Sequence, residues 1–502
     1  MTPRIAIIGA GFAGIGLAIR LRQAGYRDLV LYERSDRPGG TWRDNIYPGC
    51  ACDVPAHLYS FSFAPNPHWS RKYAPQPEIR AYIERCAREF GILPLIRFGH
   101  DLVEARFDAA SARWQLGFAG GGSAEADILV IARGQLSEPK LPDIPGRDSF
   151  AGTSFHSARW QPGFDPAGKR IGVIGTGASA IQIVPALARE ARALTVFQRS
   201  PPWIIPRRDH AYGHWRRRMF ARVPGLRRLH RLRLYAQFEL LYPGFSPGSL
   251  VARRVTALAL GHLRAQVPDP GLRRQLRPDY PLGCKRILLS DDYYPALMRE
   301  NVALVTTPIA HIAPAGVETV DGRLHALDAL VHATGFAASD FLPGLVVSGP
   351  DGRDLRQCWR DGAEAYLGVM TAGFPNLFFL YGPNTNIGHN SILFMLECQI
   401  RLITRLLDGL VRRRARTVAV RAAAMRRFNE EIAARLARGV WAAACGNWYR
   451  NEQGRITNNW PGSTLEYRWR LARPGRDAFV YDMASSGAAP RRREEEMVDA
   501  RA

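Results

Sequence analysis

Two stretches of the chain change from a strand-like to a helix-like hydrophobic pattern and back again. In RIAIIGAGFAGIGLAIRLRQAGYRDLVLYERS (4–35), a short apolar run is followed by apolar residues at helical spacing and by a second apolar run ending at Glu33. RIGVIGTGASAIQIVPALAREARALTVFQRS (170–200) repeats this order and ends at Arg199 and Ser200. The patterns predict two strand–helix–strand units, and therefore an α/β fold with two dinucleotide-binding, Rossmann-like domains.

Glycines at the first strand-to-helix turn have the spacing of a phosphate cradle. Gly9 makes the tight turn, Gly11 lets the backbone approach a pyrophosphate, and Gly14 allows helix and strand to pack closely. The pyrophosphate would lie at the helix N-terminus, and Glu33 would accept a hydrogen bond from a ribose 2′-hydroxyl. The first unit therefore predicts a dinucleotide whose ribose is not phosphorylated.

The second cradle has the same dimensions but ends in a different residue. Arg199 follows Gly175 at the same distance at which Glu33 follows Gly9. A guanidinium binds a 2′-phosphate that a carboxylate would repel, so this unit predicts NADP, although an ordinary surface arginine is the alternative. The residues assigned to this site are Gly175, Thr176, Gly177, Ala178, Ser179, Ala180, Arg199 and Ser200.

Composition and charge change this picture little. The 502 residues carry a formal net charge of +23, and residues 207–277 hold sixteen arginines against three acids. Apolar residues alternate with these arginines at roughly helical spacing, which indicates a solvated helical face or peripheral contact with an anionic membrane. No nucleic-acid recognition motif accompanies the charge, so we expect no nucleic-acid partner.

The seven cysteines and the longest apolar runs point to a cytoplasmic protein. Cys50-x-Cys52 is too close for a usual zinc pair and there is no C-x-x-C, so we predict no metal site and ordinary reduced thiols. No apolar run reaches the ~18–20 residues that cross a bilayer. The apolar stretch near the start lacks a basic lead-in and a cleavage site, and we expect no signal peptide.

Two further strands suggest how the domains are connected. ADILVIARGQLSEPKLP (126–142) and LHALDALVHATGF (324–336) resemble the crossover strands of flavoproteins of the glutathione-reductase type. This organisation implies an FAD domain formed by residues 1–145 and 335–480. It also implies an NADP domain at 150–330 with an Arg-rich helical insertion at 207–277. The charged segment 483–502 is predicted to be disordered.

The stretch FAGTSFHSARWQP (150–162) carries a family resemblance. Phe150, Gly152, His156 and Trp160 resemble the fingerprint of type I Baeyer–Villiger monooxygenases, although Gln161 stands where the family has Pro or Asp. Related enzymes that oxygenate nitrogen and sulfur usually have Phe or Tyr in place of Trp160. Within the family, His156 would act as an interdomain linker.

GGTWRDNIYPGCACD (39–53) resembles the second signature of this family, and YPLGCKR (280–286) resembles a third segment. The resemblance implies FAD contacts from Gly40, Thr41, Trp42, Asp53, Tyr59 and Val103. It implies that Lys285 binds the NADP phosphate and that Arg286 is the active-site arginine, oriented by Asp53. Trp448, in 441–470, would belong to a mobile loop over the nicotinamide.

The implied activity is that of an FAD- and NADPH-dependent monooxygenase. The family uses O₂ and a C4a-peroxyflavin to convert a ketone into an ester or lactone. Arg286 cannot lose its proton at working pH, so it can hold negative charge on the reacting oxygen atoms. Oxygenation of sulfur or nitrogen in a small organic substrate is the alternative, and the sequence leaves the substrate and the oligomeric state open.

Overall fold

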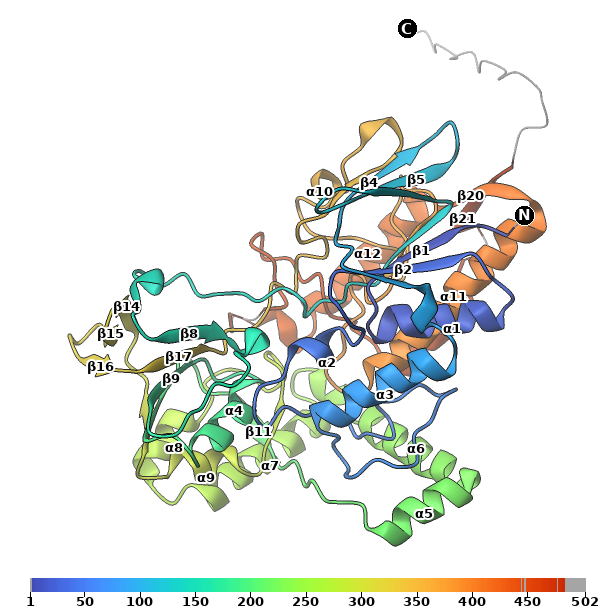
Figure 1. Cartoon of the computed structure of the whole chain (residues 1–502). Helices are drawn as coiled ribbons and strands as arrows, with labels where there is room; N and C mark the ends of the chain where they lie inside the picture. Colours follow the sequence, from blue (N-terminus) through green and yellow to red (C-terminus); the bar gives the residue numbers. More distant parts are fainter. Residues whose placement is uncertain (1, 444, 447, 476, 484–502) are drawn as a thin grey trace, which may run out of the picture.

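The first predicted unit lies in a parallel sheet of five strands. A computed structural model describes residues 2–443, 445–446, 448–475 and 477–483. The strand order is β19–β7–β1–β2–β3 (Leu377–Phe379, Ile128–Ile131, Ile5–Ile8, Leu29–Glu33 and Ile96–Phe98). Helix α1 (Phe12–Gln23) packs against α3 (Gln76–Glu89) and α11 (Ile392–Arg413) beside this sheet (Figure 1). β19 therefore comes from the second half of the chain, whereas the other four strands of this sheet come from the first half.

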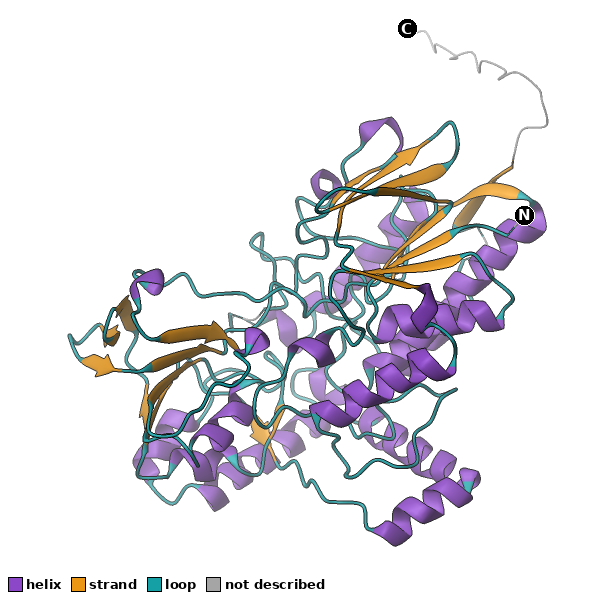
Figure 2. Ribbon diagram, in the orientation of Figure 1, coloured by secondary structure: helices purple, strands orange, loops and turns teal. Residues whose placement is uncertain are grey.

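The second unit forms another parallel five-stranded sheet. Its order is β13–β10–β9–β17–β8 (Val302–Val305, Ala193–Phe197, Arg170–Ile174, Ala329–His332 and Thr153–His156). Helix α4 (Ala180–Leu187) packs on α9 (Tyr293–Leu297) and β10. The two sheets lie on opposite sides of the molecule (Figure 2). The predicted α/β fold with two Rossmann-like units is confirmed.

Smaller sheets complete the two halves. An antiparallel sheet with one parallel edge strand has the order β18–β4–β5–β6 (Val346–Ser348, Leu102–Asp108, Arg113–Phe118 and Ser123–Ala126). Strands β14–β15–β16 (Ile309–Ala313, Gly316–Thr319 and Leu324–Ala326) form an antiparallel sheet, and β20 pairs with β21 (Ala415–Val420 and Phe479–Met483). The other helices outside the insertion are α2 (Thr41–Asp44), α10 (Leu355–Cys358), α12 (Ala422–Ala437) and α13 (Thr464–Ala472).

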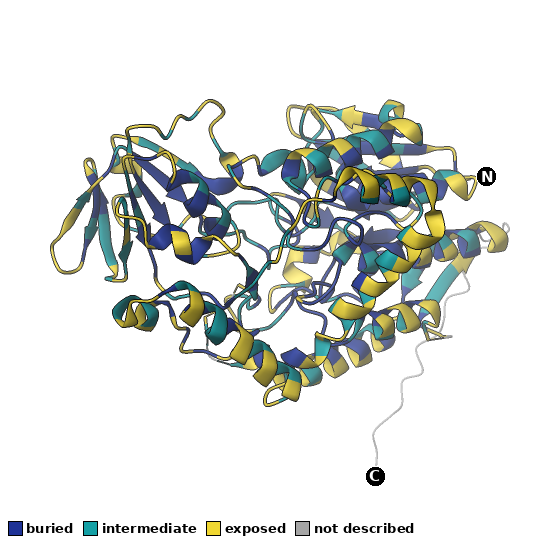
Figure 3. Ribbon diagram, turned by 90° about the horizontal axis from the view of Figure 1, so that it is seen from below, coloured by how far each residue is buried: buried dark blue, intermediate teal, exposed yellow. Residues whose placement is uncertain are grey.

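Helices fill the predicted Arg-rich insertion. They are α5 (His214–Arg222), α6 (Pro224–Glu239), α7 (Leu250–Gln266) and α8 (Pro270–Leu276). The parallel pair β11 and β12 (Ile204–Ile205 and Leu288–Leu289) closes the base of the insertion. The strands of both large sheets are mostly buried, whereas many outer helical turns are exposed (Figure 3).

Two further predictions concern a disordered tail and membrane-spanning segments. The segment predicted to be disordered, 483–502, lies outside the described residues except for Met483 at the end of β21. Across the described ranges, none of the helices combines the length and the apolar character needed to cross a membrane.

Candidate active site

The first glycine cradle has the close approaches that its sequence predicts. Gly9 has φ +108°, and a Cβ there would lie 2.8 Å from the carbonyl oxygen of Ala132. A Cβ on Gly14 would lie 2.0 Å from the carbonyl oxygen of Gly9, so helix α1 can pack on β1 only with glycine at this position. Glu33 is buried at the end of β2, and its Oε2 accepts a hydrogen bond from the Ala10 amide at 2.8 Å. These features fit the pyrophosphate and ribose of a dinucleotide.

The stretch 39–53 begins beside this cradle. Gly40 has φ +54°, and a Cβ there would lie 3.1 Å from Gly11 Cα, so the two backbones approach closely before α2 starts at Thr41. Trp42 Nε1 donates to the Tyr59 hydroxyl at 3.1 Å, which brings two predicted FAD residues together. Val103 lies in β4 and is 36% exposed.

The second cradle repeats the first. Gly175 has φ +109°, and a Cβ there would meet the carbonyl oxygen of Ala333 at 2.5 Å, much as Gly9 meets Ala132. Thr176 Oγ1 donates to the Ser200 carbonyl at 2.9 Å, which connects the glycine turn to the segment that follows β10. Gly177, Ala178 and Ser179 then lead into α4, which begins at Ala180.

Two cations gather beside the second cradle. Lys285 Nζ donates to Ser200 Oγ at 2.7 Å, although the two residues are 85 positions apart. Burial lowers the pKa of Lys285, and repulsion by the neighbouring Arg199 lowers it further. Within the described ranges, neither cation has a carboxylate partner at ion-pair distance. Asp279 acts on the pKa of Lys285 in the opposite direction, but from beyond ion-pair distance. An exposed guanidinium and an ammonium that is not directly paired with a carboxylate in the described ranges fit the 2′-phosphate of NADP.

Asp53 and Arg286 form an ion pair between the two halves of the molecule. Arg286 Nη2 and Nε both donate to Asp53 Oδ2, at 2.6 and 2.9 Å. The Asp53 carboxylate raises the pKa of Arg286 above its ordinary value, against the opposing effect of burial, so the guanidinium keeps its charge. The side chains remain 28% and 30% exposed, which leaves the pair accessible to a ligand.

The backbone before Asp53 is fixed against the second half of the molecule. Gln182 of α4 donates to the Ala51 carbonyl at 3.0 Å, and its Oε1 accepts from the Ala51 amide at 3.2 Å. A Cβ on Gly49 would lie 2.6 Å from the Gln182 carbonyl oxygen. The stretch 39–53 therefore runs from the first cradle to the second, and Asp53 lies at its end. Gln182 belongs to no sequence motif, and only the folded chain shows its part in the site.

His156 and Trp160 have structural roles. His156 Nδ1 accepts from the Ala158 amide at 3.1 Å at the start of a short 3-10 helix (Ser157–Arg159), and burial lowers the pKa of His156 to about 4. Trp160 packs edge-on against Phe155 and Phe164, with ring centroids 4.9 and 5.9 Å away. A buried neutral histidine that caps a helix supports the interpretation of His156 as a linker.

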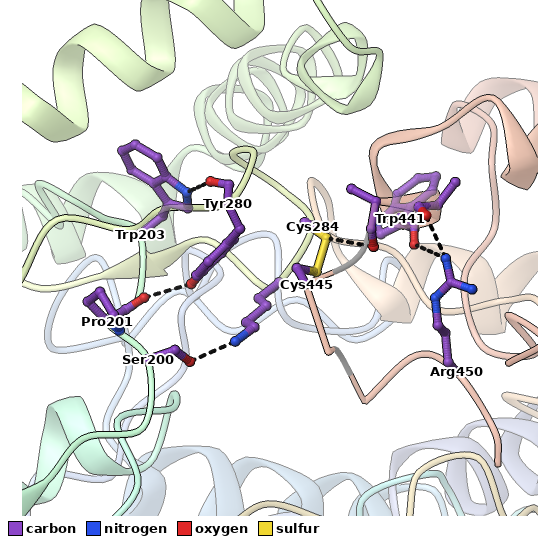
Figure 4. Close-up of a disulfide and its surroundings, with 11 residues drawn as sticks. Ser200, Pro201, Trp203, Tyr280, Cys284, Trp441, Cys445 and Arg450 are labelled. Carbon is purple, nitrogen blue, oxygen red and sulfur yellow. Dashed lines mark hydrogen bonds between the residues drawn. A yellow bond between two sulfur atoms is a disulfide. The ribbon is translucent and has the colours of Figure 1, made fainter. Parts of the chain in front are cut away.

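The prediction of reduced thiols is wrong for two cysteines. Cys284 and Cys445 form a disulfide, although they are 161 residues apart (Figure 4). Residues this distant in sequence can be paired only by the fold, so their spacing carried no signal. The other five cysteines are free, and among them only Cys358 is exposed. Trp448 lies three residues after Cys445, 36% exposed, with its ring centroid 4.3 Å from that of Tyr449.

Two nucleotide cradles and a permanently charged arginine between them define a flavoprotein oxidoreductase of the two-dinucleotide type. The Flavin-binding monooxygenase-like family matches residues 2–225. A Baeyer-Villiger monooxygenase of Pseudomonas aeruginosa is 43% identical over 488 residues, which cover 97% of this chain and 92% of the relative.

Solved structures of similar proteins agree with this relative. An oxidized steroid monooxygenase bound to NADP is 32% identical, with a TM-score of 0.85 over 96% of this chain and 99% of that protein. The protein OTEMO, in complex with FAD and NADP, is 28% identical, with a TM-score of 0.85 over 96% of this chain and 100% of its own. The chain therefore belongs to the Baeyer–Villiger monooxygenases, and the predicted class of FAD- and NADPH-dependent flavoprotein monooxygenase is confirmed.

Proposed function

We propose that the protein inserts one oxygen atom of O₂ beside the carbonyl group of a ketone to give an ester or lactone. The observation that carries this proposal is the Asp53–Arg286 pair, which is partly exposed and lies where the stretch 39–53 reaches the second nucleotide cradle. A cation held at this point can serve a reaction that develops negative charge on oxygen.

The glycine cradles and the residues beside them are the proposed cofactor contacts. Gly9, Gly11, Gly14 and Glu33 would hold the pyrophosphate and ribose of FAD, and Lys285 with Arg199 would hold the 2′-phosphate of NADPH. When bound, FAD would take electrons from NADPH and activate O₂, so that one atom of O₂ can be transferred to the substrate. The close backbone approaches and the two unneutralised cations support these assignments.

Arg286 is proposed to stabilise the oxyanion that forms when the ketone carbonyl is attacked. Its guanidinium stays charged at any working pH, so no proton has to move before it acts. Asp53 accepts two hydrogen bonds from it with a single oxygen atom, Oδ2, and would orient it as a positioning residue. Arg286 uses Nε and Nη2 for the hydrogen bonds to Asp53, and Nη1 is the proposed donor to the substrate.

The test compares a panel of ketones with a panel of organic sulfides and amines. Purified protein with NADPH should give esters or lactones from ketones, identified by mass spectrometry. Sulfoxides or N-oxides with no ester would favour the alternative, an enzyme that oxygenates sulfur or nitrogen.

We also propose the domain limits and location stated above. Residues 1–145 and 335–480 would form the FAD domain and 150–330 the NADP domain. The strand ranges support these limits, because one parallel sheet takes its strands from 5–131 and 377–379 and the other takes its strands from 153–332. A cytoplasmic location is supported by the apolar stretch at 5–23, which forms β1 and α1 within the core.

Weak contact with an anionic membrane is a further proposal, and the surface of α5 and α6 supports it. Residues 210–238 contain eight arginines and no acid. Trp215 is 75% exposed, and Leu229, Leu232 and Leu240 are 61–73% exposed along one side of α6. Among described residues, none of the eight arginines makes an ion pair with a carboxylate. Nucleic acid would leave the exposed Trp and Leu side chains without apolar partners, so an anionic lipid surface fits better.

A further inference from the structure

The disulfide joins the segment that carries the two active-site cations to the loop around Trp448. Cys284 directly precedes Lys285 and Arg286, and Cys445 lies four residues before Tyr449. Tyr449 is buried and lies close enough to Arg286 for their charges to influence each other. Figure 4 shows the bond spanning these two segments, with Ser200 and Tyr280 on one side and Trp441 and Arg450 on the other.

Each segment is separately held in place by hydrogen bonds. On one side, Trp203 Nε1 donates to the Tyr280 carbonyl at 2.9 Å, and the Tyr280 hydroxyl donates to the Pro201 carbonyl at 2.8 Å. On the other side, Arg450 Nη2 donates to the Trp441 and Ala442 carbonyls at 3.2 and 2.7 Å. The disulfide is the covalent connection between these two networks.

The two cysteines of the disulfide differ in their exposure to solvent. Cys284 is 0% exposed, whereas Cys445 is partly exposed. Cys445 is therefore the half of the disulfide nearer to solvent, and we take its sulfur as the point where an external thiolate attacks. Disulfides are uncommon in reducing compartments, and those that persist there are usually redox-sensing or catalytic.

We propose that Cys284–Cys445 is a redox-sensitive latch that holds residues 441–443 and 448–450 against the Cys284–Arg286 segment. A dithiol reductant attacks the Cys445 sulfur, the S–S bond breaks, and Cys284 leaves as a thiolate that takes up a proton. The second thiol of the reductant then closes its own disulfide and releases Cys445, so two electrons and two protons pass to the protein. The reduced loop is no longer tied to the segment that carries Lys285 and Arg286. NADPH then binds more weakly, and a smaller share of NADPH oxidation is coupled to oxygenation of a substrate.

This inference rests on the proposed function only through the use of NADPH, so its readouts do not require an ester. The expected effect of reduction is a several-fold rise in KM for NADPH and a larger share of NADPH oxidation that ends as hydrogen peroxide. The rate of flavin reduction at saturating NADPH should change less, because the cations remain present. A disulfide that served stability alone would leave KM and peroxide yield unchanged in folded protein.

The first measurement counts thiols in the holoenzyme. Denaturation and alkylation with iodoacetamide should modify five cysteines, and seven after treatment with dithiothreitol. Peptide mapping should find Cys284 linked to Cys445 before reduction. Seven modified cysteines in protein purified without reductant would overturn the proposal.

The second measurement compares variants. Cys445→Ser and Cys284→Ser should each behave like reduced enzyme and should no longer respond to dithiothreitol, whereas Cys358→Ser should behave like the unmodified protein in both states. If a serine variant does not fold, the unmodified enzyme treated with dithiothreitol replaces it in this comparison. Unchanged KM for NADPH and unchanged peroxide yield after reduction would also overturn the proposal. If reduction changes KM for NADPH and the peroxide yield as expected but no ketone gives an ester, only the proposed function is rejected.

Discussion

Removing Lys285 or Arg199 should weaken NADPH use and leave NADH use almost unchanged. Lys285 is fixed by Ser200 Oγ at 2.7 Å, and neither cation is neutralised by a carboxylate at ion-pair distance in the described part of the chain. A charge-assisted hydrogen bond to the 2′-phosphate is worth about 1.5–3 kcal/mol, so either single alanine variant should raise KM for NADPH by roughly 10- to 150-fold.

The double variant should lose more than the product of the two single effects, because in each single variant the remaining cation compensates in part. Arg199 repels Lys285 and lowers the pKa of Lys285, so removing one cation relieves the other. The assay measures NADPH and NADH oxidation by absorbance over a range of coenzyme concentrations. Arg323→Ala, at an exposed position between β15 and β16, is the matched control. An equal loss with NADH, or a normal KM for NADPH in both single variants, would refute the assignment of the 2′-phosphate site.

Three other predictions concern the remaining sites. Gly11→Val should yield folded apoprotein, because a Cβ there meets the Gly40 backbone at ordinary contact distances of 3.6 and 3.9 Å and would instead obstruct the pyrophosphate. Normal flavin content in this variant would contradict the assignment of FAD to this cradle. Arg286→Ala should still permit reduction of the flavin by NADPH but lower ester formation by ~10²–10³-fold, with oxygen consumption diverted to hydrogen peroxide. Asp53→Ala should fail less completely, since the Arg286 charge remains; rapid-mixing absorbance separates the steps, and near-normal ester formation by Arg286→Ala would contradict its role. Sedimentation with anionic liposomes at low salt should capture the protein, fade as salt rises, and weaken in a Leu229→Ser/Leu232→Ser variant but not in Leu324→Ser; no capture at low salt would reject the membrane surface.

Local pattern was enough to predict the two cradles. Glycine spacing, strand and helix periodicity, and the exchange of Glu33 for Arg199 are all encoded within about thirty residues. The family resemblance then suggested that Asp53 and Arg286 act together, and the structure places them 2.6 Å apart across 233 positions. Spacing alone contained no information about that contact.

Contacts made by the fold itself could not be predicted. Gln182 has no motif, yet it fixes the backbone before Asp53 by two hydrogen bonds. Cys284 and Cys445 were expected to be ordinary thiols because neither has a neighbouring cysteine in sequence, and their pairing depends on how the loop folds back onto the segment before Lys285. Side chains that meet only in the folded chain leave no periodic or motif signal.

The most direct test of the central claim is the fate of labelled oxygen. The purified protein should be incubated with NADPH, a ketone that it converts and ¹⁸O₂, and the product analysed by mass spectrometry. We expect an ester or lactone that carries one ¹⁸O atom, together with one equivalent of labelled water and no product when NADPH is withheld. An ester without the label, or NADPH oxidation that yields only hydrogen peroxide with every ketone tested, would contradict the account.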